Sequence, residues 1–145
     1  MFDMLRYAAL IALLMLLTGC GALPKPVEEA KAERAAAEAQ KRPKDPYDAQ
    51  VFDQLQKAGH DFTKKTTVDF YLYFPEEIAA RSAIHVLSSE GYRGDLKNID
   101  GRWQAHLAKE MVLTADDIDM ERFQMRELTV NSGGEYDGWG AQVVR

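Results

Sequence analysis

The stretch TTVDFYLYF, residues 66–74, restricts the possible folds more than any other part of the chain. Its apolar side chains recur at every second position, at Val68, Phe70, Leu72 and Phe74. Successive side chains of an extended chain point to opposite faces, so this pattern predicts a β-strand with one buried face. Such a strand must belong to a sheet whose buried face is covered by another layer.

Three helices are predicted, and the second and third of them are expected to supply that layer. The first lies in residues 48–62 and stops at Gly59, and the second begins at Pro75, whose ring suits a first turn, and stops at Gly91. The third is capped by Thr114 and closes at residues 131–134. The apolar faces of these helices are formed by Val51, Phe52, Leu55, Ala58, Ala80, Ala83, Ile84, Leu87, Ile118, Met125 and Leu128.

Three more strands follow from the remaining segments. Residues 92–112 form two extended runs around Asp100-Gly101, which is a strong hairpin signal, and residues 135–144 have strand propensity. The order is β-α-β-β-α-β with a leading helix, an α+β, ferredoxin-like plan in which two helices cover one face of an antiparallel sheet. Trp103 and Leu107 should then lie on the covered face with Phe70 and Leu72.

Residues 1–19 are interpreted as a secretory signal peptide, with Arg6 ahead of an apolar run from Tyr7 to Leu17. The run is shorter than the roughly 20 residues that a membrane-spanning helix needs. Leu17 to Cys20 resembles the lipobox of bacterial lipoproteins. That resemblance implies cleavage before Cys20, a diacylglycerol on its sulfur and acylation of the new amino terminus.

The location that follows is the cell envelope. Gly21 after the cysteine resembles the pattern that enterobacteria send to the outer membrane, which predicts a lipid anchor on its periplasmic face. Two alternatives stay open. Cys20, the single cysteine, is a buried or reactive thiol behind an ordinary signal peptide, or translation starts at Met15 and yields a cytoplasmic protein.

Residues 20–47 are predicted to be the lipidated cysteine and a solvated tether, and residues 48–145 the folded domain. Prolines bracket an interior rich in Ala, Glu, Lys and Arg, which has high helix propensity but almost no apolar face. A partly helical spacer fits this composition, and a coiled-coil segment is the alternative.

Charge argues against nucleic acid as a direct partner. The formal net charge is −5, and it falls on residues 51–145 because the charges of the earlier segments cancel. A domain of that sign repels phosphate backbones.

Catalysis, a cofactor and a metal site are not expected. His60, His85 and His106 fall on different elements, and the chain has no P-loop, no dinucleotide glycine motif and no Ser-His-Asp order. Glu135 and Asp137 share one face of the last strand, and paired carboxylates can do acid–base work, but no third group accompanies them. A structural imidazole is the expected role of His106.

The segment 135–140, EYDGWG, has two interpretations. Gly138 and Gly140 alternate with Trp139 and so lie on the opposite face of the strand from the indole. In the first, the missing side chains leave a shallow surface that a neighbouring side chain or a bound chain can approach closely. In the second, Trp139 belongs to the core and the glycines mark a twist or bulge.

This segment, after a helix containing Ile118-Asp119 and Leu128, resembles the end of the regulator of ribonuclease activity B (RraB) family. The resemblance covers roughly residues 50–144. It implies a ferredoxin-like core and an acidic cytoplasmic protein that binds and inhibits ribonuclease E. The chain departs from that pattern in its export signal and in lacking very acidic extra segments.

The expected function is that of an acidic, protein-binding regulatory or inhibitory module that faces the periplasm. Asp69, Tyr71 and Tyr73, with Gln104 and His106, decorate the open sheet face, where RNA-recognition modules carry aromatics among basic residues. Asp69 and the net charge favour a protein partner instead. The alternatives are a cytoplasmic ribonuclease E regulator and an immunity-type inhibitor of a toxin. Candidate binding residues are Asp69, Tyr71, Tyr73, Glu135, Tyr136, Asp137, Gly138 and Trp139.

Overall fold

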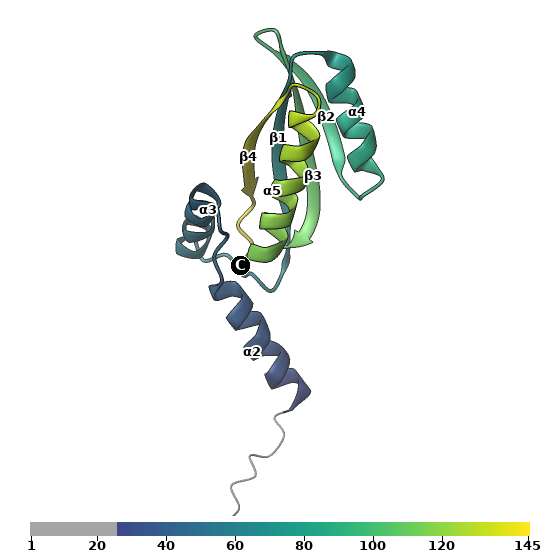
Figure 1. Ribbon diagram of the computed structural model, residues 1–145. Helices are drawn as coiled ribbons and strands as arrows, with labels where there is room; N and C mark the ends of the chain where they lie inside the picture. Colours follow the sequence, from purple (N-terminus) through teal and green to yellow (C-terminus); the bar gives the residue numbers. More distant parts are fainter. Residues whose placement is uncertain (1–25) are drawn as a thin grey trace, which may run out of the picture. The chain divides into compact units, whose positions relative to one another are not determined.

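The computed structural model describes residues 26–145 (Figure 1). The predicted signal peptide, residues 1–19, and the predicted lipid site, Cys20, lie outside this range. Helix α2 (Val27–Gln40) begins with Glu28 and Glu29 in its first turn, so the expected spacer contains a helix. Within residues 26–145, no helix combines the length and the apolar character that crossing a bilayer requires.

The folded unit, residues 34–145, contains the predicted order of elements. They are α3 (Pro46–Lys57), β1 (Lys65–Phe74), α4 (Glu77–Ser88), β2 (Arg93–Ile99), β3 (Arg102–Val112), α5 (Ala115–Val130) and β4 (Glu135–Ala141). The β-α-β-β-α-β plan with a leading helix is confirmed, and the fold is α+β with a ferredoxin-like arrangement.

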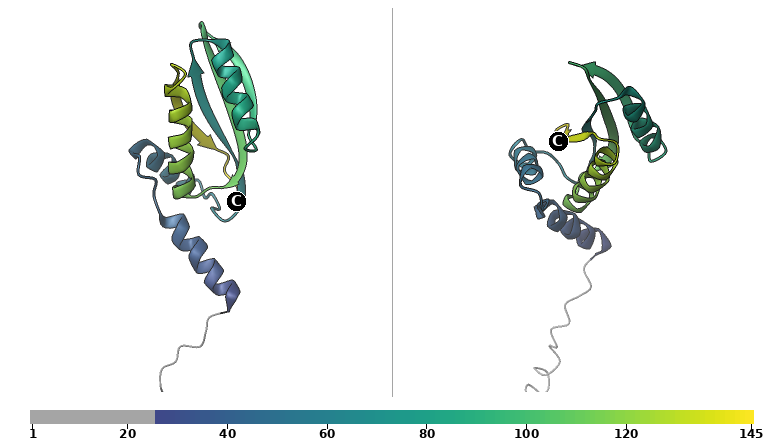
Figure 2. Two further views of the ribbon diagram at one scale, coloured as in Figure 1. Left: turned by 45° about the vertical axis from the view of Figure 1, so that its right-hand side comes forward. Right: turned by 45° about the horizontal axis from the view of Figure 1, so that its top comes forward.

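The four strands form one antiparallel sheet in the order β2-β3-β1-β4. Strand β1 therefore lies inside the sheet, while β4 is an edge strand. Phe70 of β1 lies opposite Leu107 of β3 and Trp139 of β4, so these three side chains share a face. Helices α4 and α5 lie on that face, as the views in Figures 1 and 2 show.

The core lies between this face and the helices. Val68, Phe70, Leu72 and Phe74 are fully buried, which confirms the alternation predicted for β1. Leu107 is buried as expected, and Trp103, half-buried, packs against the same cluster. The remaining buried apolar residues are Phe52, Leu55, Ala80, Ala83, Leu87, Tyr92, Ala105, Leu113, Ala115, Ile118, Met125 and Trp139.

Turns and caps explain where the elements begin and end. Asp100 and Gly101 both have positive φ, 51° and 84°, as a two-residue hairpin turn between β2 and β3 requires. The Thr114 hydroxyl accepts the Asp117 N–H at 3.1 Å and caps α5. Helix α3 starts before residue 48, because Asp45 caps it and Pro46 occupies its first turn.

Two boundaries differ from the prediction. Pro75 precedes the N-cap residue Glu76 and is not in the first turn of α4. Strand β4 ends at Ala141, short of the predicted residue 144. Val144 turns away because its backbone bonds to the segment after α3, with its N–H donated to His60 Nδ1 and its carbonyl accepting from Asp61 N.

Candidate functional site

The open face of β1 and β3 carries the predicted aromatic and acidic side chains. Tyr71 and His106 lie opposite each other in the register, and their rings stack at 5.1 Å with an interplanar angle of 13°. Burial, with a smaller contribution from the Asp69 carboxylate, raises the pKa of the Tyr71 phenol. Tyr71 therefore presents a neutral ring that is stacked on the imidazole of His106.

Carboxylates surround His106. Its Nε2 lies 2.8 Å from Asp69 Oδ1, and its Nδ1 lies 3.8 Å from Asp95 Oδ2. A histidine with both nitrogens near carboxylates is held in place by its neighbours, which agrees with the structural role expected for it. These contacts fix the side-chain positions of Asp69 and, through the stacked ring, of Tyr71.

Tyr73 is held in a similar way at the other end of β1. Its hydroxyl accepts a hydrogen bond from Gln104 Nε2 at 2.5 Å, and the Arg102 guanidinium lies 4.9 Å from its ring centroid. Arg102 also donates to Glu135 at 3.0 Å, so it joins β3 to the start of β4. The open face is thus a set of mutually supported side chains.

A bulge divides the EYDGWG segment between the two faces of the sheet. Gly138 lies opposite Tyr71 and Tyr136 lies opposite Leu72, so Asp137 is the extra residue. Gly138 has φ of 132°, a conformation that residues with a Cβ rarely adopt. Trp139 is only 8% exposed and belongs to the core cluster. The interpretation of Trp139 as core and of Gly138 as a bulge is therefore confirmed.

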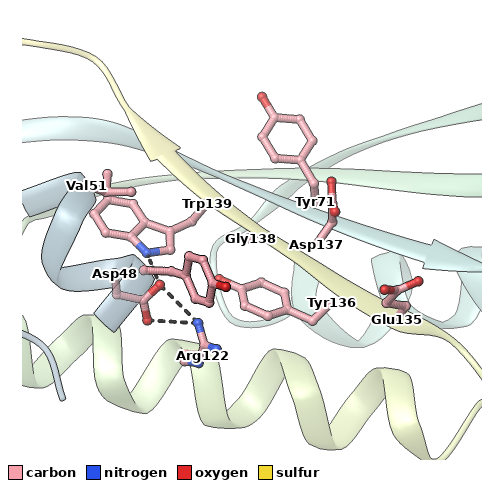
Figure 3. A pocket seen from close by; sticks show the side chains of 10 residues that line it. Asp48, Val51, Tyr71, Arg122, Glu135, Tyr136, Asp137, Gly138 and Trp139 are labelled. Atoms are coloured by element: carbon pink, nitrogen blue, oxygen red, sulfur yellow. Dashed lines mark hydrogen bonds and ion pairs between the residues drawn. The ribbon is translucent and has the colours of Figure 1, made fainter. Parts of the chain in front are cut away.

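Trp139 and Tyr136 face an ion pair that joins three elements (Figure 3). Asp48 of α3 is 2% exposed and accepts the Trp139 indole N–H at 2.9 Å. Arg122 of α5 donates to both Asp48 oxygens at 3.1 Å and pairs with Asp45 at 2.7 Å. Burial raises the pKa of Asp48, against the Trp139 hydrogen bond and the Arg122 charge, which lower it.

Neither Asp48 nor Arg122 is among the residues that the sequence predicts for the site. A signal for Arg122 was present, because it lies four residues after Ile118 and three before Met125, on the buried stripe of its helix. An arginine at such a position needs a buried partner. A second signal was the indole of Trp139, which requires an acceptor once it is buried.

Six of the eight candidate residues line one cleft of about 630 Å³. They are Tyr71, Glu135, Tyr136, Asp137, Gly138 and Trp139, and they are joined there by Tyr47, Asp48, Val51 and Arg122. Asp69 and Tyr73 do not line it; they flank Tyr71 on the open face of β1. In Figure 3, Tyr71 and Asp137 lie on one side of β4, and Trp139, Tyr136 and Arg122 lie on the other.

The site has the character of a binding surface. Across residues 26–145, no three His, Cys, Asp or Glu side chains are grouped so as to hold a metal ion. The polar groups of the open face are bonded to one another, and Tyr71 and Tyr73 are half-exposed among them. Half-exposed aromatics held rigidly among charges are typical of surfaces that bind other proteins.

A comparison with models of protein families gives a match. The model of the family RraB, "Regulator of ribonuclease activity B", matches residues 45–141, which span every element from α3 to β4. No curated protein matches the chain. The family is one of regulators, which is consistent with a domain that acts by binding a protein. Because the match covers more than half of the chain, the protein belongs to the regulator of ribonuclease activity B family.

Proposed function

We propose that this protein is a membrane-anchored bacterial lipoprotein whose RraB domain binds and regulates another protein on the periplasmic side. In this proposal residues 1–19 are the signal peptide, residues 20–47 are the lipidated Cys20 and tether, and residues 48–145 are the binding domain. The proposal assigns no enzymatic activity to the chain, because its family is one of regulators. Its partner is a protein, since the net charge of −5 repels nucleic acid.

One observation carries the binding role, namely the ordered row of Tyr71 and Tyr73 on the open face of a regulator-family domain. Both rings are held by neighbours on β3, Tyr71 by stacking on His106 and Tyr73 by the Gln104 hydrogen bond and the Arg102 contact. A rigid aromatic side chain loses little conformational entropy on binding and supplies a large contact area. These rings are therefore the expected centre of the interface, and EYDGWG borders it.

Site-specific photo-crosslinking in intact cells tests the binding role. Tyr71 is replaced by the photoreactive aromatic residue benzoylphenylalanine, and Phe123, which is 67% exposed on α5, is replaced in the same way as the matched control. We expect a specific adduct from position 71 and none of the same mass from position 123. Mass spectrometry of the adduct identifies the partner. Adducts of equal yield from both positions, or from neither, would overturn the assignment of this face.

A second candidate function is supported by the family match itself. The family is named for the regulation of ribonuclease activity. The resemblance of the sequence implies that the regulated enzyme is the cytoplasmic ribonuclease E. It requires a chain that stays in the cytoplasm, for example one that starts at Met15. Recovery of that ribonuclease from position 71 would favour this candidate, whereas an envelope protein would support the periplasmic one.

A further inference from the structure

The cleft at β4 passes over the edge of the sheet, so residues from both faces of the sheet line it. Gly138 has no side chain, and no atom lies within 4 Å of where its Cβ would be, so the strand is bare at the bulge. Tyr71 borders the cleft from the open face, and Tyr136 and Trp139 border it from the covered face. Tyr47 and Val51 of α3 complete its lining.

The aromatic lining is accessible where the cleft opens. Tyr47 is 75% exposed at the start of α3, and Tyr71 is half-exposed. The Tyr136 hydroxyl is buried and has no hydrogen-bond partner within residues 26–145, although it belongs to the lining.

The charge of the cleft is negative. Arg122 is the one cation among its lining residues, and it is already engaged by Asp45 and Asp48. The Asp137 carboxylate makes no hydrogen bond or ion pair with any residue of the described part of the chain. Glu135 is exposed and is bonded to Arg102 across the surface, an interaction that water screens strongly. An incoming cation would therefore meet one free carboxylate and one weakly paired carboxylate.

The interior of the same cleft contains an example of the cation that suits it. The Arg122 guanidinium lies 5.8 Å from the Tyr136 ring centroid while it donates to two carboxylates. A guanidinium combines a flat face that stacks on aromatic rings with a fork of donors that matches a carboxylate. Other lining residues of the cleft offer the same kinds of group, with Tyr47 and Tyr71 as rings and Asp137 as carboxylate.

We propose that this cleft binds an arginine side chain of a basic, extended segment of the partner protein. The guanidinium lies against Tyr47 and Tyr71 at the edge of the sheet and donates to Asp137. The backbone of the segment passes over β4 at Gly138. This inference rests on the proposed protein-binding function and names the chemistry of the partner at that site.

Peptide binding to the full chain in detergent micelles tests the inference. The probe is a fluorescein-labelled peptide of alternating glycine and arginine, followed by anisotropy at fixed ionic strength. The comparison peptides carry lysine or citrulline, the neutral isostere of arginine, at every arginine position. We expect the arginine peptide to bind, the lysine peptide to bind more weakly, and the citrulline peptide not to bind at up to about 1 mM.

Variants locate the binding. Asp137→Asn and Tyr47→Ala should each weaken binding of the arginine peptide by about fivefold or more. Glu110→Gln removes the same charge from an exposed position on β3 outside the cleft and should change binding by less than about twofold. Circular dichroism checks that each variant is folded, which is expected because Tyr47 and Asp137 are exposed.

The outcomes separate this inference from the proposed function. Equal weakening by Glu110→Gln and Asp137→Asn means diffuse attraction to an acidic domain and overturns the cleft assignment. Equal binding of arginine and citrulline peptides, or no binding of either, also overturns it. In each of these cases a specific adduct from position 71 in cells would leave the protein-binding function standing. Loss of both signals would remove both proposals.

Discussion

At the scale of single residues, the buried Asp48–Arg122 pair joins the helical layer to the edge strand. Asp48 accepts from Trp139 on β4 and from Arg122 on α5, so three elements meet at one carboxylate. Removing one partner of a buried ion pair leaves a charge without compensation, which costs more than replacing both partners. The pair therefore fixes how α3, α5 and β4 meet around the cleft.

We predict that Arg122→Met lowers the free energy of unfolding by about 3–5 kcal/mol, because Asp48 is then buried without its cation. The double variant Asp48→Asn/Arg122→Met should recover part of this loss, since the asparagine oxygen still accepts from Trp139 and carries no charge. Urea denaturation of the wild type, the single variant and the double variant measures both values. A double variant less stable than Arg122→Met would contradict the prediction.

His60 gives the domain a pH dependence of known sign. Its ring is buried, its Nδ1 accepts the Val144 N–H, and burial lowers its pKa from the usual 6.5. The unfolded chain therefore binds a proton more readily than the folded chain does, so the His60 contribution to stability is present above about pH 6.5 and is lost as the pH falls.

His60→Asn tests this sign, because the asparagine oxygen can accept the same N–H but does not titrate. We expect the free energy of unfolding to fall less between about pH 7.5 and about pH 5.5 in this variant than in the wild type. Urea denaturation at each pH gives the two slopes. Identical pH dependence in both proteins would show that His60 does not titrate differently in the folded state.

Two successive residues of β1, Phe70 and Tyr71, lie on opposite faces of the sheet and so test which face is the buried one. Phe70 is fully buried beneath the helices, whereas Tyr71 is half-exposed on the open face. Phe70→Ala should lower the free energy of unfolding by about 3–5 kcal/mol, because it removes a ring from the core and leaves a cavity. Tyr71→Ala is the matched control and should cost clearly less. A loss below about 1 kcal/mol for Phe70→Ala would contradict the face assignment.

At the scale of elements, the bulge of β4 determines which side of the strand each residue of EYDGWG occupies. In a strand without a bulge, Tyr136 and Trp139 would fall on opposite faces, since they are three positions apart. With the bulge at Asp137, both aromatics reach the covered face, and Glu135 and Gly138 face the open side. The conformation of Gly138 therefore allows both Tyr136 and Trp139 to lie on the covered face.

A pair of glycine substitutions tests this role of the bulge. Gly138→Ala should cost about 1–3 kcal/mol, because a side chain at φ of 132° is strained even though the space beside it is open. Gly140→Ala also enters open space but without a positive φ, and should change stability by no more than about 1 kcal/mol. Thermal denaturation compares the two. Equal costs would mean that backbone strain at Gly138 is absent.

Local signals predicted most elements of the fold because each acts within a few residues. The period of two in β1, the Asp100-Gly101 turn and the Thr114 cap all depend on side chains and backbone groups close in sequence, and all three are confirmed. The end of β4 was predicted too late, because a residue far away in the sequence takes Val144 out of the strand. The Val144 N–H bonds to His60, 84 positions away, and the alternation of residues in the last strand gives no sign of that partner.

The candidate site shows the same limit. Tyr71 and Tyr73 follow from alternation, whereas the bulge that brings Tyr136 and Trp139 to one face is a property of the pairing with β1. Asp48 and Arg122 are 74 positions apart, so only the packing of α3 against α5 and β4 brings them together. The cleft was absent from the sequence prediction for this reason, although most of its aromatic lining was identified.

At the scale of the whole molecule, the proposed lipid anchor and the acidic domain would have opposite relations to a membrane. Acyl chains on Cys20 would insert with about 0.8 kcal/mol per buried methylene, whereas a domain of net charge −5 is repelled by an anionic lipid surface. In the proposed arrangement, a spacer between them would let the domain stay near the membrane without lying on it. Attachment by lipid, and not by charge, should therefore withstand high salt.

Cys20→Ser tests this attachment. We expect the wild-type chain to incorporate a fatty-acid probe and to stay in the membrane fraction at about 1 M salt, because the anchor is apolar and is not screened. The serine variant should lose the label and the membrane association together. Met15→Leu is the matched control, since it abolishes the internal start while leaving the apolar run intact. If translation begins at Met1, this control is labelled like the wild type. Persistent labelling of Cys20→Ser would contradict lipidation at Cys20. Disappearance of the protein in Met15→Leu would mean that translation starts at Met15, which leaves the domain on the cytoplasmic side, where a ribonuclease is within its reach.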